Sequence, residues 1–119
     1  MELRENMRIV QELVPGKQIT LSHIIANPDD VLYTKLGLDP KTDYTRSAIG
    51  VLTVSPAESA VITADIAIKS SGADIGFVDR FSGTLIVTGT VSEVESAMNA
   101  VTEYTEKTLG FSVCPVTKT

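Results

Sequence analysis

The sequence predicts an α+β domain with a ferredoxin-like order of strands and helices. Residues 73–89 read as two apolar strands joined by the tight polar turn Asp79-Arg80-Phe81-Ser82-Gly83, and a helical pattern flanks them on each side. This arrangement is typical of a split βαβ core, which usually works by assembling or binding rather than by covalent chemistry. With 119 residues, the chain is long enough for one core and too short for two ordinary domains.

Two strands and a short helix are expected in the N-terminal half. Residues 18–25 alternate as a strand, with Ile19, Leu21 and His23 expected on one face. The run Asn27-Pro28-Asp29-Asp30 predicts a short helix that Asn27 caps and that Gly37 ends. Residues 48–54 form a nearly all-apolar strand, which predicts cover on both of its faces.

The next helix, over residues 56–70, is apolar on two sides. Ser55 and Glu58 predict a capping box at its start. Ile62 and Ile66 lie outside its main stripe, so we expect another subunit to cover this second side. The main stripe, expected to face the core, consists of Ala57, Ala60, Val61, Ala64 and Ile68.

A second capping box, Ser92-Glu93-Val94-Glu95, predicts a helix that runs to about Thr108. Gly110 ends this helix, and residues 111–116 predict a last strand that Pro115 restricts to a sheet edge. The expected order is therefore β-α-β-α-β-β-α-β, with an N-terminal segment in front. The inward side of the helix is expected to contain Val94, Ala97, Met98, Val101 and Thr105.

The composition excludes several classes of partner. Ten basic and fifteen acidic residues give a formal charge of −5, and no basic stripe is present to neutralise phosphates, so we expect no nucleic-acid partner. The apolar runs fall far short of the roughly 20 residues that a membrane helix needs. Residues 1–8 lack a signal-peptide core, and Cys114 is the only cysteine, so we expect a cytoplasmic protein without a disulfide.

The sequence contains almost no catalytic residues in a recognisable pattern. His23 is the only histidine, so one chain cannot form a Cys/His metal cluster. A Cys114–His23 catalytic pair is formally possible, although buried structural roles suit both residue types better. The chain has no phosphate-binding loop, dinucleotide-binding fingerprint or nucleophile elbow. We therefore expect no enzyme, no cofactor and no metal.

Three ordered segments carry a resemblance to a known family. They are Val14-Pro15-Gly16-Lys17-Gln18 with the following Thr20-Leu21 and His23, then Ala48-Ile49-Gly50, and then residues 75–83, IGFVDRFSG. Together they resemble the shell proteins of bacterial microcompartments, in particular the circularly permuted hexameric class found with ethanolamine- and propanediol-utilisation compartments. The resemblance covers nearly the whole chain from Ile9 onwards.

The resemblance implies a permuted shell domain over residues 17–119 and an N-terminal extension over residues 1–16. Unpermuted members begin at the strand equivalent to residues 48–54, whereas here the matching strand 18–25 and helix 27–36 come first. Such a rearrangement is physically permissible because domain termini are often close together on the surface.

The implied function is that of a non-enzymatic shell subunit in the compartment. Six copies would form a flat hexagonal tile, and tiles would meet edge to edge with other shell proteins, with encapsulated enzymes as further candidate partners. The resemblance places Arg80, Phe81, Ser82 and Gly83 at the pore loop around the sixfold axis, with Phe81 in place of a small residue.

Two residues correspond to positions at the tile edge. Lys69 corresponds to the family's edge lysine, although a solvated lysine at a helix C-terminus is the simpler alternative. Asn27 stands where relatives carry an arginine inserted into the adjoining tile, and a helix-capping role explains it equally well.

The segment before Pro15 has its own implied role. Its apolar residues are spaced more like a helix than a strand, but seven residues cannot decide between the two. The resemblance implies a strand of a six-membered parallel barrel over the central axis. The interior of a barrel of about eight strands is just wide enough for side chains to fill it. A barrel of six strands would therefore have no open channel and would act as a plug. The segment consists of Ile9, Val10, Gln11, Glu12, Leu13 and Val14.

Two other classes of function are alternatives. A ferredoxin-like regulatory module would bind a small effector between subunits, but few polar residues converge on any one loop. A small hydrolase on the same fold would need an anion-cradling loop or a catalytic set, and the sequence contains neither.

Overall fold

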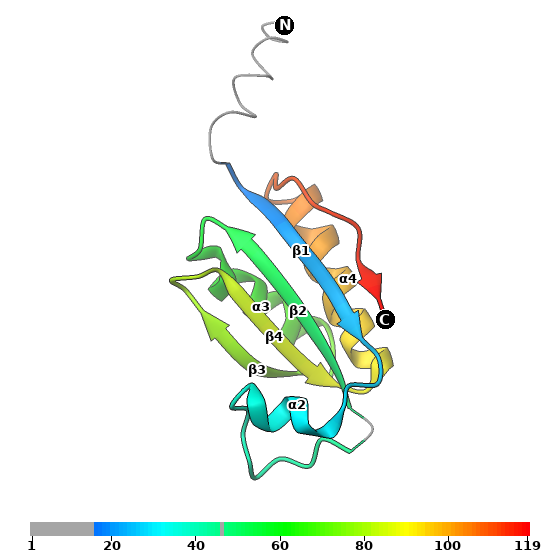
Figure 1. Ribbon diagram of the computed structural model, residues 1–119. Helices are drawn as coiled ribbons and strands as arrows, with labels where there is room; N and C mark the ends of the chain where they lie inside the picture. Colours follow the sequence, from blue (N-terminus) through cyan, green and yellow to red (C-terminus); the bar gives the residue numbers. More distant parts are fainter. Residues whose placement is uncertain (1–15, 46) are drawn as a thin grey trace, which may run out of the picture.

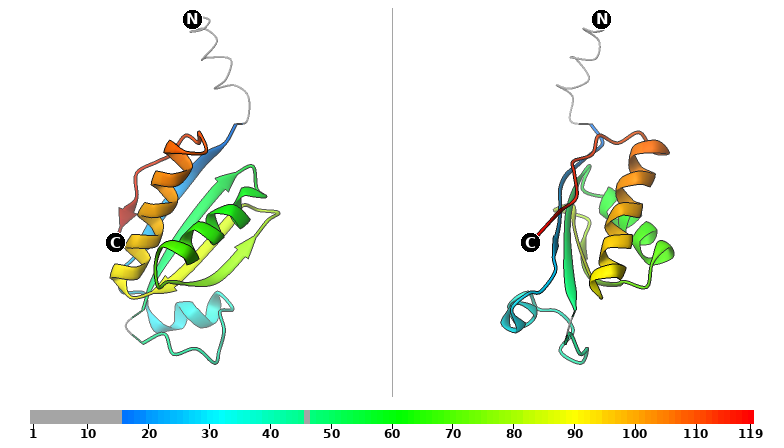
Figure 2. Two further views of the ribbon diagram at one scale, coloured as in Figure 1. Left: turned by 180° about the vertical axis from the view of Figure 1, so that it is seen from behind. Right: turned by 90° about the vertical axis from the view of Figure 1, so that its right-hand side faces the viewer.

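The computed structural model describes residues 16–45 and 47–119, which form one five-stranded sheet with two helices on one face (Figures 1 and 2). The order of elements agrees with the order predicted from the sequence. The elements are β1 (Gln18–Ile25), α2 (Asp30–Lys35), β2 (Ala48–Ser55), α3 (Ser59–Ser70), β3 (Asp74–Asp79), β4 (Thr84–Gly89), α4 (Val91–Lys107) and β5 (Thr117–Lys118).

The strands lie in the order β3-β4-β2-β1-β5. The first four are antiparallel neighbours, and β5 pairs in parallel with β1. The last strand is at a sheet edge as predicted, but its bounds differ from residues 111–116. In that stretch only Ser112 forms a bridge, to Gln18. Pro115 has no N–H for a ladder, so regular pairing begins only after it.

The main core lies between the sheet and helices α3 and α4 (Figure 2). The predicted inward side of α4 is confirmed, since all five of its residues are buried. Gly50 explains how closely α4 approaches β2. A Cβ atom there would lie 2.8–2.9 Å from side-chain atoms of Val87, Val94 and Met98. Interiors are close-packed, so no side chain fits at this position.

The predicted faces of β1 are wrong after its second residue. A β-bulge shifts the register between Ile19 and Leu21, and such a bulge puts an extra residue on one strand. Ile19 therefore shares the buried, helix-covered face with Ser22 and Ile24, while Leu21 is exposed. Strict alternation along the sequence could not reveal this change of face.

The predicted inward stripe of α3 is only partly right. Ala60 and Ala64 are buried, but Val61 and Ile68 are exposed. The helix faces the sheet with small side chains and carries its larger apolar ones outside. The predicted capping box is also wrong, because the helix begins after Glu58 without a side-chain cap. The buried residues of α3 are Ser59, Ala60, Thr63, Ala64 and Ala67.

Two other caps lie two residues away from their predicted positions. Thr90, not Ser92, forms the capping box of α4, together with Glu93. Asp29, not Asn27, caps α2 by accepting a hydrogen bond from the N–H of Val31 at 3.0 Å. The predicted end of α2 is confirmed, since Gly37 has a φ of +73° just after it.

The second face of the sheet is covered at one end only. There α2 and the following loop lie across the start of β2 (Figure 2). A small cluster of Tyr33, Leu38, Ile49 and Ile86 fills the space beneath them. The prediction that β2 is covered on both faces is therefore confirmed near its start, while Val51 and Thr53 farther along are only half-buried.

Candidate functional site

The hairpin turn between β3 and β4 (residues 80–83) is held by hydrogen bonds to both of its flanks. Asp79 accepts from the N–H of Phe81 through its carboxylate and from the N–H of Gly83 through its carbonyl, each at 2.9 Å. The carbonyl of Gly83 accepts from the N–H of Val54 on β2 at 2.8 Å. The four residues Arg80, Phe81, Ser82 and Gly83 therefore form one anchored tip.

Glycine is the only residue type that fits at position 83, at the base of this turn. Its φ of +77° lies in the left-handed region that side chains disfavour. A Cβ atom there would also collide with the carbonyl oxygen of Val54. The sequence reasoning placed Gly83 in the turn but missed its contact with β2.

The tip presents an aromatic ring and a cation to solvent. Phe81 is 81% exposed, and the guanidinium of Arg80 lies 4.8 Å from the centroid of its ring. Such an exposed cation–π contact is worth about 0.5–1 kcal/mol. Hydrogen bonds from the backbone of Phe81 and the hydroxyl of Ser82 lower the pKa of Asp79, so its carboxylate is charged at neutral pH.

Lys69 and Asn27 lie at the opposite end of the sheet from the hairpin turn. Asn27 shortly follows β1, and Lys69 shortly precedes β3. Lys69 pairs with Asp65 at 2.9 Å, with their side chains 73% and 58% exposed, and Asn27 is exposed too. One row of paired residues crosses the sheet at this end, from the end of β1 to the start of β3. It consists of Ile25, Ile49, Thr88 and Asp74.

The outer side of α3 exposes a group of large apolar side chains. Val61, Ile62 and Ile68 are each about half exposed, and Tyr104 of α4 lies across a groove from Ile62. A groove of about 440 Å³ between the two helices is lined by Ile62, Tyr104 and Lys69, among others. The predicted second apolar side is only partly right, because Ile62 is exposed while Ile66 is partly buried against the core. Tyr104 was not predicted. An aromatic residue among the charged outward residues of α4 was the sequence signal that could have indicated it.

Strand β1 begins at the end of the sheet that carries the hairpin turn. Gln18 at the start of β1 pairs with Ser55, and close by Thr53 pairs with Thr84, the residue after Gly83. The predicted barrel residues Ile9, Val10, Gln11, Glu12, Leu13 and Val14 lie outside the described residues.

Comparisons with known proteins decide the family. A family model described as "BMC domain" matches residues 48–117. The chain is also 48% identical over 112 residues to the bacterial microcompartment shell protein PduU of Salmonella typhimurium, covering 94% of this chain and 93% of that protein. The chain belongs to the BMC-domain family of microcompartment shell proteins. The resemblance seen in the sequence is therefore confirmed.

Two further similarities agree with this family. The shell protein CutR of Streptococcus intermedius is 47% identical over 117 residues, covering 98% of this chain and 97% of that protein. A solved structure described as a CutR flat hexamer superposes with a TM-score of 0.80 at 45% identity, covering 89% of this chain and 94% of that chain.

The BMC-domain shell proteins are structural components, and the polar residues of this chain fit that role. Both ring nitrogens of His23 hydrogen-bond to hydroxyls, of Thr117 at 2.6 Å and of Thr119 at 2.9 Å. Within the described residues, no hydrogen bond joins His23 to Cys114. His23 instead holds β5 against β1.

Within residues 16–45 and 47–119, the structure contains no cluster of His, Cys, Asp and Glu that could hold a metal ion. No helix in the same part of the chain is long and apolar enough to cross a bilayer.

Proposed function

We propose that six copies of this shell protein form a ring, with the hairpin turns near its axis and Lys69 near its rim. The observation that supports this most is the placement of the predicted sites at two opposite ends of the sheet. The hairpin turn lies at one end, and Lys69 and Asn27 lie at the other. A subunit that points one end at an axis and the other at a neighbouring tile needs this separation. The similar CutR flat hexamer is a six-membered assembly of the same fold.

The apolar outer side of α3 supports burial against another copy. Val61, Ile62 and Ile68 are exposed in the single chain. Contiguous exposed apolar side chains mark interaction sites in soluble proteins. In the ring we propose, a neighbouring subunit or tile covers them.

At the axis, the turn narrows the passage that a ring leaves open. Phe81 is large and projects into solvent, while the hydrogen bonds of Asp79 and Gly83 fix its backbone. Six copies of Arg80 and Phe81 would converge there. The expected consequence is restricted passage of small metabolites.

We also propose that the domain is circularly permuted. The family model begins to match at Ala48, the first residue of β2, so β1 and α2 precede the matched region. Yet β1 lies inside the sheet, between β2 and β5. A strand supplied from the front of the chain therefore occupies an interior place in the domain, as a permutation requires.

The N-terminal extension is proposed to plug the axis. Residues 9–14 of each copy would contribute one strand to a six-stranded barrel, and side chains would fill its interior completely. The support is connectivity, because β1 begins at the end of the sheet that carries the hairpin turn. Lys69 and Asn27 would contact adjoining tiles of the shell, which contains other shell proteins and faces the enclosed enzymes.

Electron microscopy of the purified full chain at high concentration tests this function. Hexagonal rings or flat sheets of them are the expected result. Separate particles without sixfold symmetry at all concentrations would contradict it.

A further inference from the structure

Two sides of each subunit remain for its neighbours in the ring proposed above. The hairpin turn lies at one end of the sheet and Lys69 at the other. The two lateral edges of the sheet are formed by β3 and by β1 with β5 (Figure 1). A rotation that closes a ring brings two different surfaces of neighbouring copies together. The edge at β3 is therefore expected to meet the edge at β1 of the next copy.

Strand β3 exposes one large apolar side chain on each face of the sheet. Paired residues of neighbouring strands share a face. Val78 pairs with Leu85, which faces the helices, and Phe77 pairs with Ile86, which belongs to the cluster on the second face. Both Phe77 and Val78 are exposed. Within residues 16–45 and 47–119, no further strand pairs with the outer edge of β3, so this edge is open to another chain.

Helix α3 extends this surface with Val61 and Ile68. Residues seven positions apart share one side of a helix. Ile62 and Lys69 line the groove toward Tyr104 of α4, so they lie on the other side. Helix α3 contacts β3, whereas α4 contacts β1 (Figure 2). The side with Val61 and Ile68 is therefore turned away from α4 and toward the β3 edge. We call this surface the β3 side and define it by Val61, Ile68, Phe77 and Val78.

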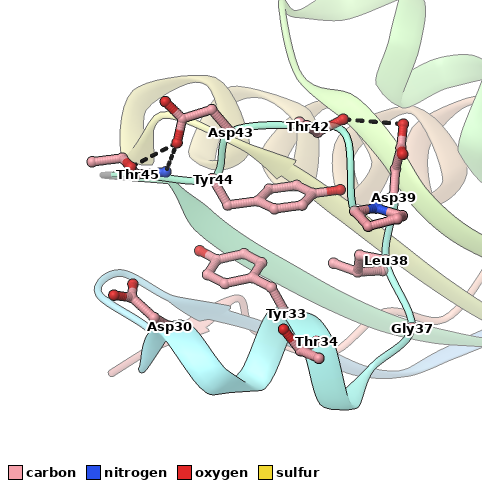
Figure 3. Close-up of a pocket in the computed structure, with 11 residues that line it drawn as sticks. Asp30, Tyr33, Thr34, Gly37, Leu38, Asp39, Thr42, Asp43, Tyr44 and Thr45 are labelled. Atoms are coloured by element: carbon pink, nitrogen blue, oxygen red, sulfur yellow. Dashed lines mark hydrogen bonds between the residues drawn. The ribbon is translucent and has the colours of Figure 1, made fainter.

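The loop after α2 limits the β3 side toward the rim. Its Tyr44 lies across a small hollow from Asp74, the first residue of β3. Tyr44 is itself stacked on Tyr33 of α2, with the ring centroids 4.6 Å apart (Figure 3). The start of β3 is thus partly enclosed by the chain's own loop, whereas the stretch with Phe77 and Val78 is uncovered.

The opposite edge has an exposed apolar residue of its own. Leu21 of β1 is exposed and pairs with Thr53, so it shares the second face of the sheet with Phe77. The C-terminal segment forms the edge beside it, because Ser112 bridges to the start of β1 and β5 pairs with its end. Between these two attachments Pro115 is exposed. We call this surface the β1 side and define it by Lys17, Leu21, Pro115 and Lys118.

The charges of the two sides are complementary. Strand β3 begins at Asp74 and ends at Asp79, while the β1 side carries Lys17 just before β1 and Lys118 in β5. The row of paired residues through Lys118 ends at Ile75, next to Asp74. Lys17 and Asp79 both lie at the end that carries the hairpin turn. An acid of one side and a lysine of the other therefore stand at corresponding places, which favours this pairing over contact between two β3 sides.

We propose that the β3 side of each subunit packs against the β1 side of the next copy around the ring. The proposal rests on the six-membered ring stated under Proposed function and adds the two surfaces that close it. The C-terminal segment of one copy would cover Phe77 and Val78 of its neighbour. Each copy would use both of its sides, so no apolar edge of the sheet stays exposed in the closed ring.

Phe77→Asp tests the β3 side by light scattering. A carboxylate buried in an apolar contact without a partner is costly, so we expect the ring to be replaced by single chains at micromolar concentration. Tyr104→Asp is the matched control, because Tyr104 is an aromatic residue of similar exposure, 47% against 44%, and lies on neither side. It should keep the ring. Ile68→Asp repeats the test on a helix, and thermal unfolding shows that each variant is folded.

Carbodiimide cross-linking of the unmodified protein identifies the surfaces that meet. This reagent joins carboxylates to amines that touch, and we expect Asp79 to be joined to Lys17, or Asp74 to Lys118. Neither link can form within one chain. Strands β4 and β2 separate β3 from β1, so about 14 Å lies between their backbones, more than the two side chains span together. Lys118 and Glu95, which pair at 2.6 Å within one chain, give the positive control.

The possible failures point to different errors. A single-chain mass for the unmodified protein would overturn the ring and this inference with it. A ring that survives both Phe77→Asp and Ile68→Asp would overturn the packing of the two sides and leave the ring standing. The same conclusion follows if the control link to Glu95 forms while neither intermolecular link does. If Phe77→Asp does not fold, Ile68→Asp and the cross-links decide.

Discussion

Gly83 joins the exposed tip of the hairpin to the middle of the sheet. Its carbonyl accepts from the N–H of Val54, and its backbone has a positive φ. A second glycine, Gly37, has a similar φ of +73° but has no atom within 4 Å of the place a Cβ would take. Substitution at Gly37 therefore introduces backbone strain alone, whereas substitution at Gly83 introduces backbone strain and a steric collision.

We predict that Gly83→Ala destabilises the protein more than Gly37→Ala. The left-handed backbone costs an alanine about 1–2 kcal/mol at either position. Only at Gly83 does the collision with Val54 add to it. Thermal unfolding of both variants beside the unmodified protein measures the difference. Equal losses would mean that the contact with β2 does not constrain the turn.

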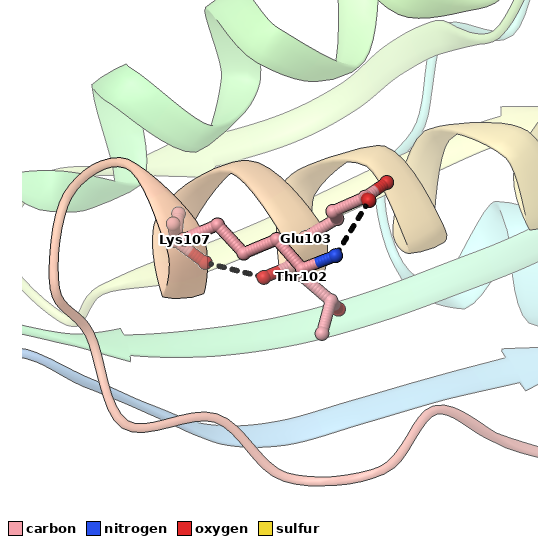
Figure 4. Close-up of polar contacts among 4 residues, drawn as sticks. Thr102, Glu103 and Lys107 are labelled. Carbon is pink, nitrogen blue, oxygen red and sulfur yellow. Dashed lines mark hydrogen bonds and ion pairs between the residues drawn. The ribbon is translucent and has the colours of Figure 1, made fainter.

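Lys69→Glu is predicted to weaken the association of tiles while leaving each ring intact. The side chain is 73% exposed, so the change should alter folding stability by less than about 0.5 kcal/mol. Lys107→Glu is the matched control, because the side chain of Lys107 is 68% exposed in the last turn of α4 and pairs with Glu103 at 3.1 Å (Figure 4). Sheet formation by electron microscopy should be lost only in Lys69→Glu. If it persists there, Lys69 is a solvated surface residue.

At the level of elements, the N-terminal extension carries the clearest prediction. Deleting residues 1–14 should leave the ring folded, since the sheet and helices described above are untouched. Val10→Asp and Leu13→Asp test the barrel, because six unpaired carboxylates inside one narrow barrel would be costly. Whichever position points inward should release the segment, which a protease then removes quickly. A wild-type segment cleaved as fast as either variant would contradict the plug.

The sequence was sufficient for the elements whose pattern is local. All five inward residues of α4 were predicted, because that helix has one apolar side and polar residues elsewhere. The hairpin turn was also predicted, since its polar run stands between two apolar strands. These features depend on spacing along the chain alone.

Features that depend on tertiary contacts were missed. The bulge near Leu21 reverses the faces of β1, and close packing selects alanine rather than valine for the buried side of α3. The helix caps differ from the predicted ones because Thr90 and Asp29 lie within one turn of the predicted residues and can cap the same helices. The sequence predicted which residues belong to the candidate site. It could not place Lys69 and the hairpin turn at opposite ends of the sheet, because that placement depends on how the strands pair.

In the ring that we propose, each molecule is a tile subunit with an axial end, a rim end and an apolar flank. The axial end carries the hairpin turn and the start of β1, and the rim end carries Lys69 and Asn27. The apolar flank on α3 is exposed in the single chain, and the proposed ring would cover it. Each of these features has a use in a closed ring and none in a monomer.

The mass of the full chain in solution tests this account most directly. Size-exclusion chromatography with light scattering at micromolar concentration should give about six times the 12.7 kDa of one chain. The ring should hold that mass on dilution, because the half-exposed Val61, Ile62 and Ile68 would otherwise meet water. A mass of 12.7 kDa throughout the micromolar range would contradict the account.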